Sequence, residues 1–346
     1  MFKKEDLSII CCPKCKSDLQ LLTDSMLKCI YCNLEYPIID GIPRLLYFGE
    51  DKVTYNKMWD YKWYVLDGGK GYTYEQLDEN SIGYKIHNVF RYNEYENEAF
   101  IHLGDEKSTA VDIGCGIGQY TVKLLEKGAK RVFAIDLTRG VDIAKKILEE
   151  RMPHLLDNIV FLQANARYLP IKTESADLSM ALGSIHLSGY LEECIEEMVR
   201  ITQKNKRFIV WIYSKPIVPL SDDKHNIKGL IELLYFTLRT LVLEFTYIVT
   251  KRIPNKLLVF ILKIFASDAV YFLRNLPVIG KIFKFLTIPG IPNHPDKGYR
   301  LINLYDTYAP SFTEFSDELD VIRWSKKFNF RILSFSEWRL GFLGEK

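Results

Sequence analysis

Short apolar runs alternate with segments of helix length between residues 109 and 213. Five runs rich in β-branched and aromatic residues predict strands: TAVDIG (109–114), RVFAIDL (131–137), IVFLQAN (159–165), ADLSMALG (176–183) and RFIVWIY (207–213). Between them, amphipathic segments predict helices over 119–127, 140–151 and 189–202. This alternation is typical of an α/β fold whose sheet is mostly parallel and carries helices on both faces.

The alternation stops after Pro216, where apolar segments of helical character take over. It resumes with a predicted helix near 316–328 and predicted strands at 330–335 and near 337–343. We therefore expect a single α/β domain that carries a large helical insertion before its last helix.

Five of the seven cysteines lie within the first 32 residues. Cys12 and Cys15 form one C-x2-C pair, and Cys29 and Cys32 form a second pair after thirteen intervening residues. Two such pairs supply four sulfurs for a tetrahedral Zn²⁺, with no open position for catalysis. The spacing predicts a structural zinc site that stabilises a segment too short for a large core, with Cys11 left over unless it exchanges with Cys12.

The first predicted strand runs into the glycine-rich loop of VDIGCGIGQY, which then opens a helix. Glycines at this position allow a tight turn and a close approach of the backbone to a ligand. A bare G-x-G-x-G pattern fits a dinucleotide, a phosphate or S-adenosylmethionine equally well. Asp112 two residues before the first glycine, Asp136 at the end of the next strand and Asn165 at the end of the third favour S-adenosylmethionine.

VDIGCGIGQY, FAIDL and FLQANARYLP together resemble the successive cofactor motifs of class I S-adenosylmethionine-dependent methyltransferases. The resemblance implies a Rossmann-like core with a mostly parallel seven-stranded sheet. It also implies that Asp136 binds the ribose, that Asp112 helps to hold the amino group, and that Asn165 takes the place of the usual aspartate beside the adenine. The implied cofactor-binding residues are Asp112, Gly114, Cys115, Gly116, Gly118, Asp136, Leu137, Asn165 and Ala166.

The N-terminal run from LSIICCPKCKSDL to LEYPIIDGIPRLL resembles the Trm112-like zinc-ribbon family, whose members stand alone or precede methyltransferase cores. We therefore divide the chain into five parts. They are the ribbon (1–48), an aromatic-rich linker with helices over the active site (49–108), the methyltransferase core (109–215), a helical apolar lid (216–302) and the C-terminal end of the core (303–346).

The acceptor side of the site is less defined. His186 follows the fourth strand and matches a histidine that often faces the methyl group in this class, where it is either a general base or a packing residue. Asp306 and Tyr308 in NLYDTYAPSF are further catalytic candidates. Trp59, Tyr61 and Trp63 in MWDYKWYVL, and Tyr305, either line the acceptor pocket or pack around the core.

Residues 230–290 are strongly apolar but are interrupted by Glu232, Arg239, Glu244, Lys263 and Asp268, which argues against a spanning helix. Eight basic and three acidic residues give the segment a local charge of +5. It is either a helical lid over an acceptor with a hydrophobic part or an amphipathic element on a membrane surface, and the two roles are compatible.

Charge and targeting signals limit the remaining possibilities. The 46 basic and 44 acidic residues nearly cancel, which argues against a strongly basic nucleic-acid-binding protein. The cysteine pattern and the lack of an evident signal peptide predict a cytoplasmic protein, peripheral to a membrane at most. We expect methyl transfer to a small-molecule, glycan-related or lipid-linked acceptor. The alternatives are a ribosomal RNA guanine methyltransferase and a non-catalytic partner-binding protein, and the oligomeric state is left open.

Overall fold

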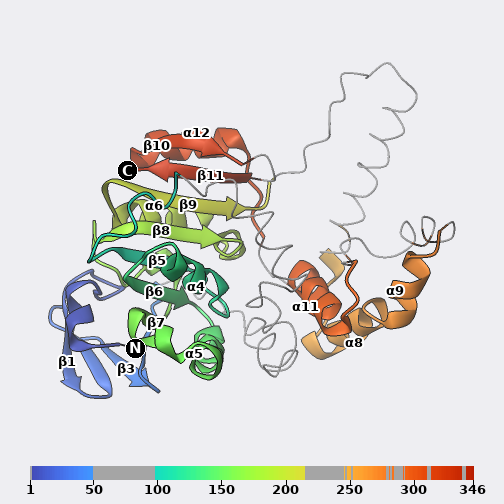
Figure 1. The fold of residues 1–346 in the computed structure, drawn as a ribbon, viewed down its shortest axis with the longest axis horizontal. Helices are drawn as coiled ribbons and strands as arrows, with labels where there is room; N and C mark the ends of the chain where they lie inside the picture. The colour runs from blue at the N-terminus through green and yellow to red at the C-terminus, as the bar shows by residue number, and fades with distance from the viewer. Residues whose placement is uncertain are drawn as a thin grey trace. The chain divides into compact units, whose positions relative to one another are not determined.

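The computed structural model describes residues 2–49, 98–214, 245, 248–250, 252–277, 280, 283, 291, 293–309, 313–336 and 340–346. These residues belong to two compact units (Figure 1). One unit contains the N-terminal residues, 98–214 and the C-terminal residues from 313 onward, and the other contains the described residues between 245 and 309. The predicted aromatic segment with Trp59, Tyr61 and Trp63 lies outside the described residues.

The first unit is built on a sheet whose central strands match the predicted α/β pattern. Its strands follow the order β7-β6-β5-β8-β9-β11-β10, and only β11 runs antiparallel to its neighbours. The bounds are β5 Thr109–Ile113, β6 Arg131–Asp136, β7 Ile159–Ala164, β8 Ala176–Leu182, β9 Thr202–Ile212, β10 Arg331–Phe335 and β11 Leu340–Glu345. Every residue of β5 and β7 is buried, as expected for strands covered on both faces.

Helices cover both faces of this sheet. The helices α4 (Gln119–Glu126) and α5 (Gly140–Arg151) pack on one face, where residues such as Leu124 and Leu148 are buried. The helices α6 (Leu191–Ile201) and α12 (Glu318–Phe328) pack on the other face. Three short 3-10 helices, η4 (Pro153–Asn158), η5 (Ala166–Tyr168) and η6 (Ile185–Leu187), connect these elements.

Two strands extend at least two residues beyond their predicted bounds. β9 starts at Thr202 instead of 207: Thr202 pairs with Ala176 and Arg207 with Leu178 of β8, and residues 203–206 between them form an irregularity in the register. β11 ends at Glu345 instead of 343, because GFLGE keeps pairing with β9 although two of its residues are glycines. A Cβ at Gly344 would lie 2.3 Å from the Phe208 ring, so the strand needs glycine there for close packing.

The N-terminal residues form a small β-structure that continues the main sheet. After the 3-10 helix η1 (Lys4–Ser8) come the antiparallel strands β1 (Leu19–Thr23), β2 (Met26–Cys29), β3 (Glu35–Ile39) and β4 (Ile42–Leu45). β4 pairs in parallel with β7, so that Arg44 lies opposite Gln163 and Leu45 opposite Ala164. The sheet therefore runs without interruption from β1 to β10, with the N-terminal part at one edge (Figure 1).

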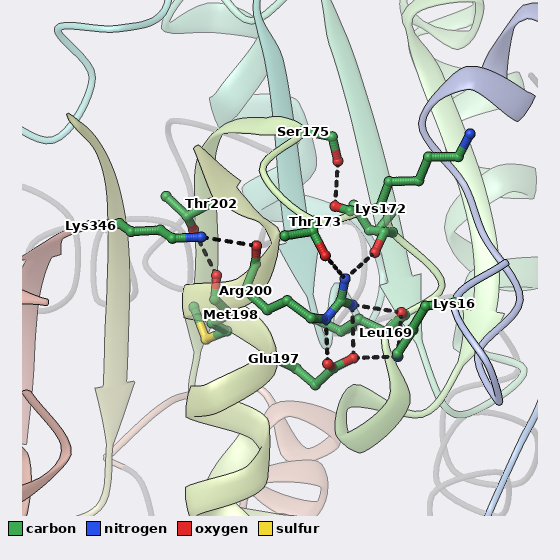
Figure 2. A network of polar contacts seen from close by, with 11 residues as sticks. Lys16, Leu169, Lys172, Thr173, Ser175, Glu197, Met198, Arg200, Thr202 and Lys346 are labelled. Carbon is green, nitrogen blue, oxygen red and sulfur yellow. Dashed lines mark hydrogen bonds and ion pairs between the residues drawn. The ribbon is translucent and has the colours of Figure 1, made fainter. Parts of the chain in front are cut away.

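Polar contacts fix this N-terminal part to the core. The Lys16 ammonium lies 2.7 Å from the Glu197 carboxylate of α6 and 3.1 Å from the carbonyl oxygen of Leu169. Figure 2 shows these contacts. The Arg200 guanidinium binds both oxygens of Glu197 and also donates to the carbonyl oxygens of Leu169 and Ile171. Because these groups are largely buried, the two cations need the additional hydrogen bonds that the backbone carbonyl oxygens accept from them.

Apolar contacts join the same two parts. Ile10, Leu27 and Leu45 of the N-terminal part are fully buried and belong to one continuous hydrophobic cluster with residues of the core strands and α6. At the other side of the interface, Arg131 of β6 forms a two-pronged ion pair with Asp6 of η1. The N-terminal part and the core therefore share one hydrophobic core and are not two independent domains joined by a linker.

The second unit is helical in the part that the structure describes. It contains α8 (Asn255–Phe265), α9 (Asp268–Arg274) and α11 (Lys297–Tyr308). Its core contains residues of α8 and α11, with Leu304, Tyr305 and Tyr308 fully buried. Arg300 is also fully buried, and its guanidinium binds Asp268 and the carbonyl oxygens of Ala266, His294 and Pro295.

Candidate functional site

The glycine-rich loop lies at the carboxyl end of β5, where the strand order reverses between β5 and β8. Ligands of open α/β sheets bind at such a switch point. Gly114 has φ of +75°, and a Cβ there would lie 2.1 Å from the Cβ of Ser184, which follows β8. Gly118 has φ of +86° and precedes α4 as its N-cap residue. The loop therefore favours glycine at both positions for backbone conformation, and at Gly114 for close packing as well.

Asp136 connects this loop to the end of β6. One of its carboxylate oxygens accepts a hydrogen bond from the Gly116 N–H at 2.9 Å. The other accepts from the backbone N–H of Thr138 at 2.8 Å and from its hydroxyl at 2.7 Å. These bonds hold the carboxylate beside the glycine loop, and a carboxylate is an acceptor for a ligand hydroxyl. The sequence predicted Asp136 but gave no role to Thr138, although a hydroxyl two residues after a strand-end acid is a usual turn partner.

Asp112 is buried within β5, on the sheet side of the loop. Its carboxylate accepts a hydrogen bond from the Thr121 hydroxyl of α4 at 2.7 Å. Burial raises the pKa of Asp112 to about 7; the hydrogen bond from Thr121 opposes this shift and the nearby charge of Asp136 adds to it. A cationic group placed beside Asp112 would return its carboxyl to the ionised form. Asp112 is therefore suited to respond to a positively charged ligand.

The end of β7 forms the next part of the candidate site. The side-chain oxygen of Asn165 accepts from the Arg167 N–H at 3.0 Å and thereby caps η5. Its side-chain nitrogen donates to the carbonyl oxygen of Tyr47 at 3.3 Å. The amide oxygen still has a second lone pair for the adenine amine that the resemblance implies. Ala166 starts η5, and Leu137, which follows Asp136, accepts a hydrogen bond at its carbonyl oxygen from Gln163 at 3.1 Å.

Two contributors from the N-terminal part were not predicted. Arg44 of β4 binds both oxygens of Asp142 in α5 and donates to the side-chain oxygen of Gln163 at 3.3 Å. Tyr47 supplies the carbonyl oxygen that binds Asn165 and packs its ring on Tyr168 with 4.9 Å between ring centroids. The sequence signal for these contacts was Arg44 itself, because it is a single charge inside the apolar run IPRLL.

Cys115 lies within the glycine loop and is buried. Burial raises the pKa of its thiol well above the usual value, and the negative charges of Asp136 and Asp112 act in the same direction. A thiol in these surroundings is neutral and inert. Cys115 therefore acts as a small residue of the crowded loop.

His186 lies in η6, directly after β8 and its turn. Its side chain is fully buried, with the ring 4.1 Å from that of Tyr213 and 6.4 Å from that of Trp211, centroid to centroid. Its carbonyl oxygen accepts from the Glu314 N–H at 2.8 Å. In the same corner the Glu314 carboxylate accepts from the Leu191 N–H at 2.9 Å and so caps α6. This aromatic burial favours the packing alternative for His186 in the conformation described.

The other catalytic candidates lie in the second unit. Tyr305 and Tyr308 are fully buried in the core of that unit, and Asp306 belongs to the same helix, α11. The structure does not bring them together with His186 within one unit, so that their joint action on an acceptor stays a prediction. Residues 230–290 lie in the same unit and are described only in part.

The four cysteines selected by their spacing converge on one centre. The Sγ atoms of Cys12, Cys15, Cys29 and Cys32 all lie within 4.8 Å of one another. The Cys12–Cys32 and Cys15–Cys29 sulfur pairs are 3.6 and 3.5 Å apart. A tetrahedral Zn²⁺ with Zn–S bonds of about 2.3 Å needs sulfurs roughly 3.8 Å apart, so the cluster fits zinc after small shifts of the sulfur positions.

The surroundings of the cysteine cluster also suit a metal. The pKa of Cys15 falls to about 6: burial opposes ionisation, but hydrogen bonds from Ser17 and from the neighbouring thiols outweigh it. The Tyr36 hydroxyl lies 3.2 Å from the Cys12 sulfur, where it can donate to a thiolate. Cys11 stays outside the cluster. It is buried at the contact with the core, and burial raises the pKa of its thiol to about 11.

Comparisons with known proteins agree with this geometry. Residues 111–210 match the family model described as "Methyltransferase domain". This part of the chain is an S-adenosylmethionine-dependent methyltransferase domain. The match runs from β5 to β9 and so covers the glycine loop, Asp136 and Asn165.

The individual relatives are distant in sequence. The ubiquinone/menaquinone biosynthesis C-methyltransferase of Hahella chejuensis is 30% identical over 129 residues, 35% of this chain and 49% of the relative. The enzyme of the same name from Sinorhizobium fredii is 26% identical over 118 residues, 34% of this chain and 46% of the relative. The chain thus spans about half the length of the curated relatives it matches.

Among solved structures, a Bacillus halodurans protein assigned as a methyltransferase aligns with a TM-score of 0.36 and 12% identity. The alignment covers 68% of this chain and 67% of that one. Within the part of the chain that the structure describes, no helix is long and apolar enough to cross a bilayer.

Proposed function

We propose that this protein transfers the methyl group of S-adenosylmethionine to a small-molecule, glycan-related or lipid-linked acceptor. The observation that carries this proposal is the bond between the Asp136 carboxylate and the Gly116 N–H at 2.9 Å. It joins the acid at the end of β6 to the glycine loop after β5. The two elements that would hold the ribose and the methionine portion are therefore positioned before any ligand binds, which reduces the cost of binding.

In this proposal each cofactor contact comes from a loop at the carboxyl ends of β5, β6 and β7. Gly114, Gly116 and Gly118 allow the backbone to approach the cofactor, and Asp112 favours its cationic amino group. Asp136 and Leu137 contact the ribose, while Asn165 and Ala166 contact the adenine. Cys115 fills the loop without reacting, because its thiol stays protonated.

When bound, S-adenosylmethionine supplies an activated methyl group on a sulfonium, and the transfer leaves S-adenosylhomocysteine. The bond to sulfur breaks as the acceptor forms its bond to the methyl carbon, and an acceptor proton leaves to a base or to solvent. What the protein must supply is alignment of the acceptor and exclusion of water. We place the acceptor near the corner after β8, where His186 lies, and leave the identity of a base to experiment.

The acceptor class is supported by two observations. Two relatives are named as C-methyltransferases of ubiquinone/menaquinone biosynthesis, and neither name refers to a nucleic acid. The chain also carries a net charge of only +2, whereas binding to an RNA backbone depends on many cationic contacts.

We also propose that the N-terminal part, residues 1–48, is a zinc ribbon in which Cys12, Cys15, Cys29 and Cys32 bind one structural Zn²⁺. Four sulfur ligands complete a tetrahedral shell and leave no position for a substrate. Zinc thiolates persist in a reducing compartment, which supports a cytoplasmic location.

Calorimetry with S-adenosylhomocysteine tests the cofactor assignment. Asp136→Ala should lower the affinity by about 2–3 kcal/mol, because hydrogen bonds to a charged acceptor contribute ~1.5–3 kcal/mol each and do not add fully. The matched control is Asp157→Ala, which removes an exposed acid in η4 and should leave the affinity unchanged. Equal binding by the wild type and Asp136→Ala, or tight binding of NAD instead, would reject the assignment.

The acceptor class is tested with radiolabelled S-adenosylmethionine and fractionated cell extract. The label is expected in the lipid or small-molecule fraction and not in RNA. Label that appears in ribosomal RNA would favour the RNA methyltransferase alternative, and cofactor binding without label in any fraction would favour the non-catalytic one.

A further inference from the structure

Helix α8 of the second unit is apolar on two opposite faces. Its inner face consists of Leu258, Val259 and Leu262, which are at most 5% exposed and pack in one cluster with residues of α11. Its outer face carries Leu257, Phe260 and Ile264, which are 50%, 63% and 54% exposed. At about 100° per residue these three side chains point within one narrow sector, directly opposite the inner face. An outer face of this kind needs a partner to cover it.

The apolar stripe is flanked by cations. Lys256 and Lys263 are exposed, and their spacing of seven residues places both along the same side of the stripe. The sequence from 245 to 267 contains four basic residues and no acidic residue. Phe245 and Ile248, just before α8, are also more than half exposed and extend the apolar character of this region.

We propose that the outer face of α8 docks on the surface of an anionic lipid bilayer. Leu257, Phe260 and Ile264 would enter the boundary between headgroups and acyl chains, and Lys256 and Lys263 would reach the lipid phosphates. Interfacial helices combine an apolar stripe of this kind with flanking cations. The long lysine side chains of such helices keep the ammonium groups at headgroup level, while their aliphatic parts lie in the apolar layer.

The charge of α8 argues against a second copy of the chain, or another protein, as the partner of its outer face. Two copies of the chain meeting face to face through this stripe would bring the lysines of α8 close to those of the other copy, with no acid on the helix to offset them. Lysine is also depleted in the interfaces of protein complexes. An anionic headgroup layer satisfies the cations and the apolar stripe together. This contact does not depend on the methyl-transfer reaction.

Vesicle flotation of the full chain tests the proposal. Vesicles of phosphatidylcholine with 30% phosphatidylglycerol are compared with pure phosphatidylcholine, at low and at high salt. The wild type should bind the anionic vesicles, and binding should weaken by roughly tenfold or more at high salt because the headgroup charge is screened. Leu257→Ser combined with Phe260→Ser should abolish binding to the anionic vesicles, and Lys256→Glu with Lys263→Glu should weaken it and reduce its dependence on salt.

Matched controls come from the other unit. Leu319→Ser removes a side chain that is 69% exposed on α12, and Lys326→Glu reverses an exposed charge on the same helix. Neither should change vesicle binding. All variants should keep the far-ultraviolet circular dichroism and the S-adenosylhomocysteine affinity of the wild type, which separates this test from the test of the proposed function.

Three results would overturn the proposal. The first is a wild type that does not float with anionic vesicles at low salt. The second is flotation that Leu257→Ser with Phe260→Ser leaves intact. The third is a dimer, measured by light scattering, that this double variant dissolves while vesicles bind neither protein; the outer face of α8 would then be an interface between two copies.

Discussion

Arg44 lies directly opposite Gln163 in the parallel pair of β4 and β7 and donates a hydrogen bond to its side-chain oxygen at 3.3 Å. Gln163 in turn donates to the carbonyl oxygen of Leu137, the residue after Asp136. An uninterrupted chain of hydrogen bonds therefore leads from the last strand of the N-terminal part to the loop proposed to hold the ribose. The N-terminal part thus supports the cofactor site as well as the edge of the sheet.

Arg44→Met should destabilise the first unit by about 2–4 kcal/mol, because it leaves the mostly buried Asp142 with a weaker set of partners. The Arg44 side chain is 6% exposed and that of Asp142 is 18% exposed. The melting temperature of the full chain, followed by circular dichroism, should fall by several degrees. Arg139→Met is the control, because Arg139 also pairs with Asp142 but is 55% exposed. Its effect should stay within about 0.5 kcal/mol. Equal shifts for both variants would contradict the role of Arg44.

Asn165→Asp restores the residue that the cofactor motif usually carries, yet it should destabilise the protein. An aspartate cannot donate the bond that Asn165 gives to the Tyr47 carbonyl oxygen, and it places two oxygens against each other. Loss of one such bond costs about 0.5–1.5 kcal/mol. Thermal unfolding measures the cost. A variant as stable as the wild type would show that the contact with Tyr47 contributes nothing.

The zinc proposal predicts one Zn²⁺ per chain in the purified protein. Cys29→Ser should lose the metal and also lower the melting temperature of the methyltransferase domain, because the ribbon and the domain share β4–β7 pairing and one hydrophobic cluster. Cys11→Ala should keep the metal, since Cys11 lies outside the cluster of four sulfurs. Elemental analysis and a melting curve give both quantities. Metal-free wild type that melts at the same temperature as the metal-loaded protein would argue against a structural role for zinc.

The affinity for S-adenosylhomocysteine should fall as the pH is lowered below about 7. The raised pKa of Asp112 means that its carboxyl is protonated below that pH, whereas the cationic amino group of the ligand favours the ionised form. Binding then releases a proton, and the affinity changes by up to about tenfold per pH unit. Asp112→Asn should remove this dependence between pH 5.5 and 8, as calorimetry would show. An unchanged slope in the variant would assign the titration to another group.

The same carboxyl affects the stability of the unliganded protein. The unfolded chain ionises Asp112 near pH 4, but the folded protein keeps the proton until about pH 7. The folded state therefore binds more protons in this interval, and its stability should fall as the pH rises from about 4 to about 7. Thermal unfolding of Asp112→Asn should lack this contribution. A pH profile of stability identical to that of the wild type would contradict it.

The sequence by itself determined the core sheet and its loops. Runs such as TAVDIG and IVFLQAN are buried on both faces, so their apolar character was sufficient to predict β5 and β7. The loop needs glycine at Gly114, which has a left-handed conformation and lies against Ser184, and the spacing of the two cysteine pairs defined the cluster of four sulfurs. These features depend on residues close together in the chain, or on rules for parallel sheets that hold whatever the rest of the chain does.

Only the tertiary structure decided how the N-terminal part and the core act on each other. The pairing of β4 with β7 joins residues more than a hundred positions apart, and no local pattern specifies such a partner or its register. Arginine is usually an exposed residue. Arg44 is buried because Asp142 and Gln163, from two other elements, accept its hydrogen bonds. In the same way, only the structure shows that Tyr308 packs in the core of its own unit, because an amphipathic helix does not itself determine which surface covers its apolar face; its proposed role toward an acceptor stays a prediction.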